Sequence, residues 1–538
     1  MSHPVPEKGR VRMRIRDLEV RVAATGESIL KGVSFDLKAG EIFALVGESG
    51  SGKSVTSMAT MRLLPDALKI SAGDVFVDDT DLLALPESKM QDVRGRQVAM
   101  IFQNAMTALN PVQTVGDQVA ETLRLHTTLS GAKLRSRVET LFEEVGIPEP
   151  AQRFSFFPHQ LSGGQQQRVM IAMALACEPE VLIADEPTTA LDVTIQEQVL
   201  ELIRELTRSR QLAVLLITHD MGVVKQTADE VGVMYRGEII ERASVNNFFH
   251  APQEPYSRQL IDALPDLSQF KAERESTPLL ELKDVKVHFP IRKGVFQRVV
   301  DYTRAVDGVS LSIGRGETYA LVGESGSGKS TLGRAILNLE TTVGGTIKFE
   351  GVALNNMARR AMLPYRKRVQ VIFQNPYSSM NPRLTVGDII AEGMISLGVV
   401  STAADRQERV LRLLERVQML PEHASRYPHE FSGGQLQRIA IARALAVEPE
   451  LIICDEPTSA LDVSIRAEVL DLLQVLQREE GVSYLFITHD LSIVPTLADH
   501  VGVMQYGKLV EQGSAEQILT NPQHPYTKAL LASVPRLD

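Results

Sequence analysis

Residues 47–54 read GESGSGKS, and residues 323–330 repeat the same letters. Each copy follows a short apolar run and precedes a stretch suited to a helix, which is the strand–loop–helix setting of a phosphate-binding loop. Glycine lets successive backbone N–H groups face phosphate oxygens, and the following helix adds its positive N-terminal end. Because two identical copies share this setting, chance glycine turns explain them poorly. The sequence therefore predicts a phosphate site in each half of the chain.

Other motifs recur in the same order, at an offset of 270 or 271 residues. They are Gln103 and Gln374, LSGGQ at 161–165 and FSGGQ at 431–435, Asp185-Glu186 and Asp455-Glu456, and His219 and His489. A repeat of this length is a duplicated domain rather than a solenoid repeat. We expect a first domain at residues 1–265, a polar linker at 266–278 and a second domain at 279–538. So short a linker keeps the two domains adjacent.

The apolar pattern of each half predicts an α/β domain. In the first half, the runs at residues 42–46, 181–184 and 213–217 are short, wholly apolar and suited to buried parallel strands. Residues 12–22 also suit a strand, and 166–176 suit a helix. The stretch between the glycine loop and the strand that ends in Asp-Glu is mostly helical in pattern, which indicates a smaller helical insert.

Composition narrows the class of protein. With 44% hydrophobic and 23% charged residues, the 538-residue chain is typical of globular proteins and long enough for two full cores. The formal net charge of -10 argues against a general nucleic-acid binder. Two cysteines, Cys177 and Cys454, exclude a disulfide scaffold or a four-cysteine metal site within one chain, and suit a reducing cytoplasm.

No apolar stretch approaches the ~20 residues that span a bilayer. The N-terminus lacks the apolar core of a signal peptide. Any role in a membrane process is therefore expected to depend on partner proteins.

Each glycine loop ends in a lysine and a serine with distinct chemistry. Lys53 and Lys329 can reach the β- and γ-phosphates of a nucleotide. Ser54 and Ser330 can ligate Mg²⁺. The two loops therefore predict two sites for a Mg²⁺-bound nucleotide.

Asp185 and Asp455 each end an apolar run, where a buried carboxylate is costly without a partner. Mg²⁺, directly or through water, is the natural partner. The next residues, Glu186 and Glu456, can orient or deprotonate an attacking water. An Asp-Glu pair alone could equally be a solvated strand end, and the glycine loops are what favour the catalytic interpretation.

The SGGQ segments place exposed backbone before a predicted helix, which is a second anion-binding surface in each half. The SGGQ sequence alone could also be a flexible loop, but its position 20 residues before the Asp-Glu pair makes the pattern specific. If this surface and the glycine loop lie on different lobes, the two surfaces of one half cannot both contact the same γ-phosphate. The SGGQ surface of the other half can then complete the site.

Together these motifs resemble the nucleotide-binding domains of ABC ATPases, over nearly the whole chain. The resemblance implies two tandem P-loop domains that bind ATP and Mg²⁺, each with a mostly parallel core sheet, an antiparallel β part and a helical subdomain. The loops that match Walker A supply Gly47, Ser49, Gly50, Gly52, Lys53, Ser54 and Val55, and Gly323, Ser325, Gly326, Gly328, Lys329, Ser330 and Thr331. The segments that match the family signature supply Ser162, Gly163, Gly164 and Gln165, and Ser432, Gly433, Gly434 and Gln435.

The resemblance also implies the catalytic and metal-binding residues. Glu186 and Glu456 match the catalytic glutamate, and His219 and His489 match the switch histidine that contacts the γ-phosphate. A lone histidine at a strand end is more often structural, but the ITHD context in both halves favours function. The implied metal-site residues are Ser54, Gln103, Asp185, Ser330, Gln374 and Asp455. Gln103 and Gln374 match the Q-loop, which also contacts membrane subunits, and 190–192 and 460–462 match the D-loop.

Finer features are similar to the peptide-importer branch. They are FQNPYSSMNP at 373–382, HPYT at 524–527 and FPIRKG at 289–294. With the fused two-half layout, they resemble the ATPases of microcin C and oligopeptide importers. Some unfused relatives carry a C-terminal cysteine cluster that is absent from this chain, so no iron–sulfur site is carried over.

One departure concerns the adenine. The family usually stacks an aromatic side chain on the base, and Phe289 matches that place in the second half. The matching residue in the first half is Val22. The first site is therefore expected to hold adenine more weakly.

We expect a peripheral ATPase at the cytoplasmic face of the inner (plasma) membrane that energises import of peptides or peptide-like compounds. The implied partners are two transmembrane permease subunits and a periplasmic or extracellular substrate-binding protein, without nucleic acid. The halves are expected to close head to tail around two ATP molecules, with Lys53 facing Ser432 and Lys329 facing Ser162.

Two other classes stay open at this point. Fused double ABC ATPases also act on ribosomes, but those usually have a long charged helical linker, whereas this linker is short. DNA-repair members carry zinc-binding cysteines or long coiled coils. An exporter ATPase is a second alternative, and the need for a substrate-binding protein would distinguish an importer from it.

Overall fold

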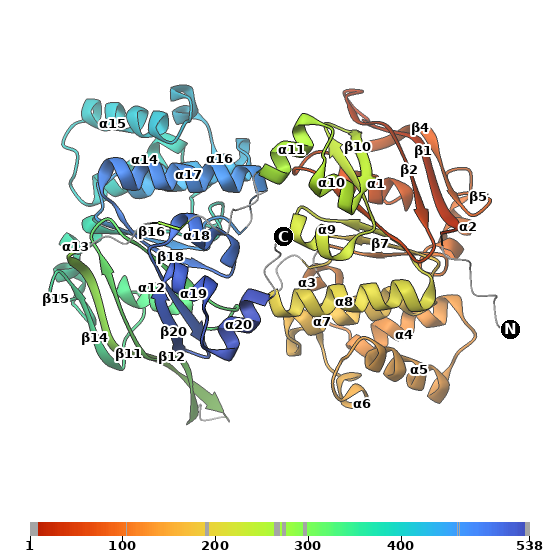
Figure 1. Cartoon of the computed structure of the whole chain (residues 1–538), viewed down its shortest axis with the longest axis horizontal. Coiled ribbons are helices and arrows are strands. Elements are labelled where there is room, and N and C mark those ends of the chain that lie inside the picture. The colour runs from red at the N-terminus through yellow and green to blue at the C-terminus, as the bar shows by residue number, and fades with distance from the viewer. Residues whose placement is uncertain are drawn as a thin grey trace. The chain divides into compact units, whose positions relative to one another are not determined.

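The computed structural model describes residues 9–103, 105–188, 193–262, 270–271, 276–293, 298–459, 461 and 463–532 (Figure 1). The chain divides into two compact units, one within Met1–Leu264 and one within Pro265–Val534. Most of the expected linker, and of the segments that resemble D-loops, lies outside the described residues. No helix within the described ranges is both long enough and apolar enough to cross a bilayer.

A six-stranded, mostly parallel sheet forms the centre of the first unit. Its strands are β3 (Ile42–Val46), β6 (Val98–Ile101), β7 (Val181–Asp185), β8 (Ala213–Ile217), β9 (Glu230–Tyr235) and β10 (Glu238–Ser244). Their order is β10-β9-β3-β8-β7-β6, and β10 alone runs antiparallel to its neighbour. β3, β7 and β8 are buried along their whole length and are apolar except for Asp185 at the end of β7, as strands covered on both faces should be.

A four-stranded antiparallel sheet packs against this central sheet. It consists of β1 (Val11–Val22), β2 (Ser28–Lys38), β4 (Leu68–Val77) and β5 (Thr80–Asp81), in the order β2-β1-β4-β5. Side chains from both sheets share one apolar core. Within it, the ring of Phe35 stacks on that of Phe43 with centroids 4.9 Å apart. This contact ties the antiparallel sheet to the central strand β3.

Helices of the first unit cover the central sheet and form a helical subdomain. They are α1 (Lys53–Thr60), α2 (Glu87–Val93), α3 (Ala105–Ala108), α4 (Val115–His126), α5 (Gly131–Glu144), α6 (Pro150–Arg153), η1 (Pro158–Gln160), α7 (Gly163–Leu175), α8 (Val193–Arg210), α9 (Met221–Thr227), α10 (Val245–His250) and α11 (Pro255–Asp262). α4, α5 and α7 pack on one another (Figure 1). α7 also packs on the edge strand β6. This arrangement is the expected helical insert.

The second unit repeats both sheets. Its antiparallel sheet has the order β12-β11-β14-β15 and its central sheet the order β16-β17-β18-β13-β19-β20. The strands are β11 (Pro278–Lys293), β12 (Arg298–Gly314), β13 (Thr318–Val322), β14 (Gly344–Phe349), β15 (Val352–Ala353), β16 (Val369–Ile372), β17 (Leu451–Asp455), β18 (Ser483–Thr488), β19 (His500–Gln505) and β20 (Lys508–Ser514). As in the first unit, the strand before the glycine loop lies inside the sheet.

The helices of the second unit follow the same plan. They are α12 (Lys329–Ile336), α13 (Arg359–Arg368), α14 (Val386–Ser396), α15 (Ala403–Arg416), η2 (Pro421–Ser425), η3 (Pro428–Glu430), α16 (Gly433–Leu445), α17 (Val463–Glu480), η4 (Leu491–Ile493), α18 (Val494–Leu497), α19 (Ala515–Thr520) and α20 (Pro525–Ala532). α14, α15 and α16 pack together in place of α4, α5 and α7. The expected fold class is confirmed for both units.

Two features distinguish the second unit. The β11–β12 pairing runs from Pro278 opposite Gly314 out to Lys293 opposite Arg298, so this hairpin is longer than β1–β2 and projects from the lower edge of the unit in Figure 1. In addition, Lys271 from the expected linker donates a hydrogen bond to Gln477 at 2.9 Å, within this unit.

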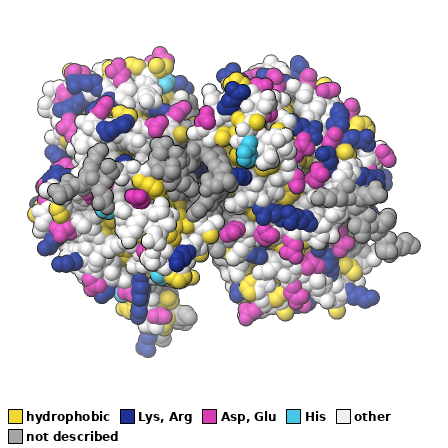
Figure 2. All heavy atoms as spheres, in the orientation of Figure 1, with side chains coloured by type: hydrophobic (Ala, Val, Ile, Leu, Met, Phe, Trp, Pro, Cys, Tyr) yellow, Lys and Arg dark blue, Asp and Glu magenta, His cyan; other side chains and the backbone are white. Residues whose placement is uncertain are grey.

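Charged side chains are mixed on the face shown in Figure 2. Lysine and arginine alternate with aspartate and glutamate over the coloured part of both units, without gathering into one basic patch there. This mixture of both signs agrees with the modest net charge of -10.

Candidate active sites

The glycine loop of each unit joins an inner strand of the central sheet to a helix. It links β3 to α1 in the first unit and β13 to α12 in the second. Gly47 and Gly323 have φ angles of 147° and 149°. A Cβ built on either would lie 2.2 Å from a backbone oxygen, that of Met234 or Met504. Only glycine allows the strand to enter the loop along this path.

The middle of each loop is open. Gly52 and Gly328, which precede the helices, have φ angles of 110° and 105° and are crowded by neighbouring atoms. By contrast, a Cβ on Gly50 or Gly326 would meet nothing within 4 Å. The exposed loop residues are Ser49, Gly50, Ser325 and Gly326. Val55 and Thr331, in the first turns of α1 and α12, are half-buried. The backbone between the crowded glycines is therefore accessible to a phosphate group.

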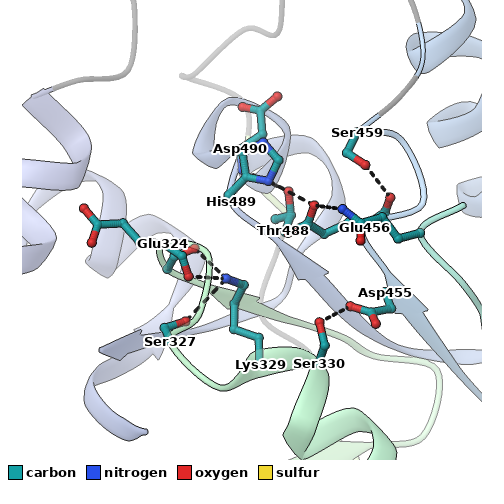
Figure 3. Close-up of polar contacts among 12 residues, drawn as sticks. Glu324, Ser327, Lys329, Ser330, Asp455, Glu456, Ser459, Thr488, His489 and Asp490 are labelled. Atoms are coloured by element: carbon teal, nitrogen blue, oxygen red, sulfur yellow. Dashed lines mark hydrogen bonds and ion pairs between the residues drawn. The ribbon is translucent and has the colours of Figure 1, made fainter. Parts of the chain in front are cut away.

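The loop lysine is fixed across the loop in both units. Lys53 Nζ donates to the carbonyl oxygens of Gly47 and Glu48, at 2.7 and 2.9 Å. Lys329 Nζ does the same with Gly323 and Glu324, both at 2.7 Å (Figure 3). Each ammonium group is thus held over the loop by backbone oxygens, where its charge can meet phosphate oxygens.

A serine hydroxyl and a buried carboxylate meet at the start of each helix. Ser54 Oγ donates to Asp185 at 3.1 Å, and Ser330 Oγ donates to Asp455 at 2.7 Å. Burial raises the pKa of both aspartates, although these hydrogen bonds offset part of the effect. Ser57 adds a second hydroxyl, 3.4 Å from Asp185.

These oxygens fit Mg²⁺. The ion prefers oxygen ligands and is commonly held by one or two protein groups, with water and phosphate oxygens completing the shell. Within the described ranges, no group of three or more histidine, cysteine, aspartate or glutamate side chains could enclose a metal without the nucleotide. When bound, Mg²⁺ would neutralise charge on the phosphates. Ser54 with Asp185, and Ser330 with Asp455, are the pairs that would hold it.

A glutamate, a glutamine and a histidine converge beside each serine–aspartate pair. In the first unit, Gln103 Nε2 donates to Glu186 at 2.6 Å, and His219 Nδ1 lies 3.0 Å from the other oxygen of Glu186. Three segments far apart in sequence therefore meet at one carboxylate. The sequence predicted each of these residues, and the structure brings them together.

The second unit repeats this cluster. Gln374 Nε2 donates to Glu456 at 2.9 Å, and His489 Nδ1 lies 3.3 Å from the same carboxylate oxygen (Figure 3). Burial alone would raise the pKa of Glu456, but His489, together with the charge of Lys329 and the hydrogen bond from Gln374, lowers that pKa. The hydrogen bond with Glu456 in turn raises the pKa of His489. The glutamate is therefore held ionised, as a base for water must be.

Both glutamates have an unusual backbone conformation. Glu186 and Glu456 each have a φ angle of 47°, in the left-handed region that non-glycine residues seldom adopt. Their N–H groups donate at 2.9 Å to Ile217 and Ile487 on the neighbouring strands β8 and β18. These bonds fix the turn after β7 and β17, so the carboxylate points toward the glutamine and the histidine. Backbone strain of this kind is found at functional sites.

The SGGQ segments begin the helices α7 and α16. Ser162 Oγ accepts the N–H of Gln165 and Ser432 Oγ accepts that of Gln435, at 3.3 and 3.4 Å, and each glutamine side chain accepts the serine N–H in return. These capping boxes start the helix at Gly163 and Gly433, earlier than residue 166 predicted for the first unit.

The SGGQ segments also leave their helix ends exposed. Ser162, Gly163, Ser432 and Gly433 face solvent. Gly164 and Gly434 pack so closely on α8 and α17 that a Cβ would lie 2.5 and 2.4 Å from Ile195 and Ile465. α7 packs on the edge strand β6, whereas the glycine loop follows β3, which is three places away in the sheet. Within a unit, the helix that begins at the SGGQ segment and the glycine loop therefore adjoin different strands of the central sheet.

The structure aligns Val22 with Phe289. Asp17 in β1 and Asp284 in β11 form equivalent irregularities, with φ angles of 45° and 49° and N–H groups bonded to a serine of the paired strand. Val22 and Phe289 each lie five residues further on. Phe289 is 39% exposed, so its ring can receive a base.

Two further contacts were not assigned from the sequence. One is the hydrogen bond that the Ser57 hydroxyl donates to Asp185, in addition to the one from Ser54. The second unit has no counterpart, because Gly333 stands at the matching position. The other is a tyrosine on the C-terminal helix of each unit, bonded to the glycine loop. The repeat of the PxxPY pattern, at 252–256 and again at 522–526, could have drawn attention to this tyrosine, although it does not identify the residue that the tyrosine contacts.

Comparison with known proteins identifies the family. The model described as "ABC transporter" matches residues 30–189 and 306–459. The chain belongs to the ABC transporter family of ATPases. This ABC ATPase also matches the model described as "Oligopeptide/dipeptide transporter, C-terminal region", at residues 240–284 and 510–538. Both units therefore carry the ATPase core and the C-terminal region.

Similar proteins span nearly the whole ABC ATPase. The "Peptidoglycan transport ATP-binding protein YejF" of Agrobacterium fabrum is 48% identical, over 97% of this chain and 96% of the relative. The "Glutathione import ATP-binding protein GsiA" of Escherichia coli is 48% identical, over 94% of this chain and 86% of the relative. Among solved structures, the ATP-binding cassette MJ0796 bound to ADP and Pi aligns at 28% identity and a TM-score of 0.40, over 44% of this chain and 99% of that one.

Proposed function

We propose that this ABC ATPase energises the import of peptides or peptide-like compounds. The observation that carries the proposal is the C-terminal region of oligopeptide and dipeptide transporters, which occurs once in each unit beside a complete catalytic cluster. A ribosome-associated ATPase or an exporter would leave that region unexplained. The ATPase would lie at the cytoplasmic face of the membrane with two permease subunits and a substrate-binding protein outside.

The cargo class follows from the relatives. One similar protein is named for peptidoglycan transport and another for glutathione import. The sequence features shared with microcin C importers point to the same kind of molecule. Their common chemistry is a short chain of amide-linked residues. We infer that the cargo is a short peptide or a peptide-like conjugate, selected by the permeases and the binding protein.

Hydrolysis would use the same residues in both units. Lys53 and Lys329 would hold the β- and γ-phosphates, and Glu186 and Glu456 would take a proton from the attacking water. The hydrogen bond from Gln103 or Gln374 fixes the orientation of that carboxylate. His219 and His489 contact the same carboxylate through Nδ1, and each imidazole would meet the γ-phosphate from there.

The two units would complete each other's sites. The site of Lys53, Asp185 and Glu186 would receive the signature residues Ser432 and Gly434. The site of Lys329, Asp455 and Glu456 would receive Ser162 and Gly164. Support comes from the exposed SGGQ helix ends and their separation in the sheet from the glycine loop of the same unit. ATP binding would close the units, and hydrolysis would reopen them.

Uptake by cells tests the proposal. A strain lacking this chain should lose uptake of a labelled tripeptide, of glutathione or of a peptidoglycan peptide. The wild-type chain should restore that uptake, whereas the Glu186→Gln and Glu456→Gln double variant should not. Normal uptake of all three compounds in the deletion strain, with the chain co-purifying with ribosomes instead of permeases, would overturn it.

A further inference from the structure

A tyrosine from the C-terminal helix touches the glycine loop in each unit. The hydroxyl of Tyr256 on α11 accepts the N–H of Glu48 at 3.1 Å. The hydroxyl of Tyr526 on α20 accepts the N–H of Glu324 at 3.0 Å. Each tyrosine lies more than 200 residues from its partner, so the contact depends on the folded unit.

The tyrosine and the loop lysine hold the same peptide group. The carbonyl of Gly47 and the N–H of Glu48 belong to one planar peptide and point in opposite directions. Lys53 donates to that carbonyl at 2.7 Å, while Tyr256 accepts from that N–H. If this peptide rotated, both contacts would be lost together. The tyrosine hydroxyl therefore fixes the orientation of the first peptide in the loop.

The second unit has the same arrangement. Lys329 donates to the carbonyl of Gly323 at 2.7 Å, and Tyr526 accepts the N–H on the other side of that peptide. The two copies differ in what supports the ring. Tyr256 packs against Tyr235 with ring centroids 4.5 Å apart, whereas Gln505 stands at the matching place in β19. The hydroxyl contact is therefore the shared feature, and the ring contact is not.

A glutamate anchors the start of each C-terminal helix. The two carboxylate oxygens of Glu241 on β10 accept the N–H groups of Gln253 and Glu254, at 2.9 and 3.0 Å. Glu511 on β20 accepts those of Gln523 and His524, at 2.6 and 3.0 Å. Burial alone would raise the pKa of both glutamates, but the nearby hydroxyl of Ser257 or Thr527, together with these N–H groups, lowers it. Each helix therefore begins at a fixed point on the central sheet.

The apolar side of each helix packs near the loop's own strand. Leu260 of α11 shares a buried cluster with Val46, the last residue of β3. Leu530 of α20 shares a cluster with Val322, the last residue of β13. The helix is thus fixed by the carboxylate at its start and by this core along its length. Its tyrosine has a defined position relative to the glycine loop.

We propose that Tyr256 and Tyr526 are positioning residues for ATP binding. Each hydroxyl keeps the first loop peptide in the orientation that presents the lysine and the open backbone of the loop to phosphate. The C-terminal region of each unit would then be part of its nucleotide site. The proposal rests on the ATP-binding role of the glycine loops.

Tyrosine-to-phenylalanine variants of the full chain test this proposal. Tyr256→Phe with Tyr526→Phe removes two hydroxyl groups and keeps both rings. One hydrogen bond has a net value equivalent to about a threefold to tenfold change in binding. The dissociation constant for mant-ATP and the KM for ATP should both rise by about that factor, whereas kcat should change by less than about twofold. Glu511→Gln exchanges one of the two oxygens that accept the N–H groups before α20 for a donor, so it should also raise the KM for ATP.

Two controls make the result specific. Tyr365→Phe removes a hydroxyl from α13 in the second unit and should leave the KM unchanged. The Lys53→Ala, Lys329→Ala double variant should lose mant-ATP binding. If the wild-type chain itself binds no mant-ATP, the ATP-binding role of the glycine loops is refuted, rather than the role of the tyrosines. If wild type binds ATP and the tyrosine variants match its KM, while only their melting temperature falls, the tyrosines merely pack the tail and the positioning proposal is wrong.

Discussion

The two units hold the same reacting groups but differ around the nucleotide. The glutamine–glutamate distance is 2.6 Å in the first unit and 2.9 Å in the second, and the histidine–glutamate distance is 3.0 and 3.3 Å. Where adenine is expected, however, the first unit has Val22 and the second has Phe289, in the outer part of a longer hairpin. The two units therefore share the glutamine–glutamate–histidine cluster and differ at the position where adenine stacking is expected. We expect the sites to differ in affinity more than in turnover.

The largest effect should come from the glutamates. Changing both Glu186 and Glu456 to glutamine removes the proposed base for water and should lower steady-state ATPase activity by at least about 100-fold. ATP binding should persist, because the substitutions leave in place the glycine loops and the backbone oxygens that hold their lysines.

The single variants test the comparison itself. Since both units keep the full cluster, Glu186→Gln and Glu456→Gln should slow hydrolysis by similar factors. A tenfold difference between them would show that one cluster dominates turnover, against this account. Wild-type turnover in the double variant would remove the glutamates from the mechanism altogether.

An intermediate effect should come from the signature serines. Ser432→Arg places a long cation at the exposed start of α16 and should prevent nucleotide trapping at the glycine loop of the first unit. Ser162→Arg should do so for the second unit. Photolabelling with azido-ATP, followed by separation of the two halves, would reveal which loop loses label. Loss of label from the mutated serine's own half would contradict head-to-tail closure.

The smallest effect should come from exchanging the adenine residues. Stacking on an aromatic ring is worth on the order of ~1 kcal/mol for a base, and ~1.4 kcal/mol is a tenfold change in affinity. Phe289→Val should therefore weaken the second site several-fold, and Val22→Phe should strengthen the first. Titration of the full chain with a fluorescent ATP analogue measures both changes. If neither substitution alters affinity, these positions do not contact adenine.

The sequence was sufficient for the fold and for much of each cluster. Short apolar runs predicted β3, β7 and β8, because strands buried on both faces consist mainly of apolar residues. Repetition of each motif predicted which residues would gather, and Gln103, Glu186 and His219 do meet. These features are local patterns, so a single sequence can display them.

Contacts that depend on tertiary structure could not be predicted in the same way. The bond between Tyr526 and Glu324 joins residues 202 positions apart, and no local pattern specifies such a partner. The left-handed conformation of Glu186 and Glu456 was equally hidden, since it follows from the bond to the neighbouring strand. The start of α7 was placed late because the serine cap, rather than helix propensity, fixes that end.

The most direct test is the stoichiometry and affinity of ATP binding to the full-length Glu186→Gln, Glu456→Gln double variant, which should bind ATP without consuming it. Equilibrium titration should give two ATP molecules per chain, with dissociation constants several-fold apart. Phe289→Val in the same background should bring the two constants together. One ATP per chain, or two sites of equal affinity before that substitution, would contradict the account of two complete sites that differ at the adenine.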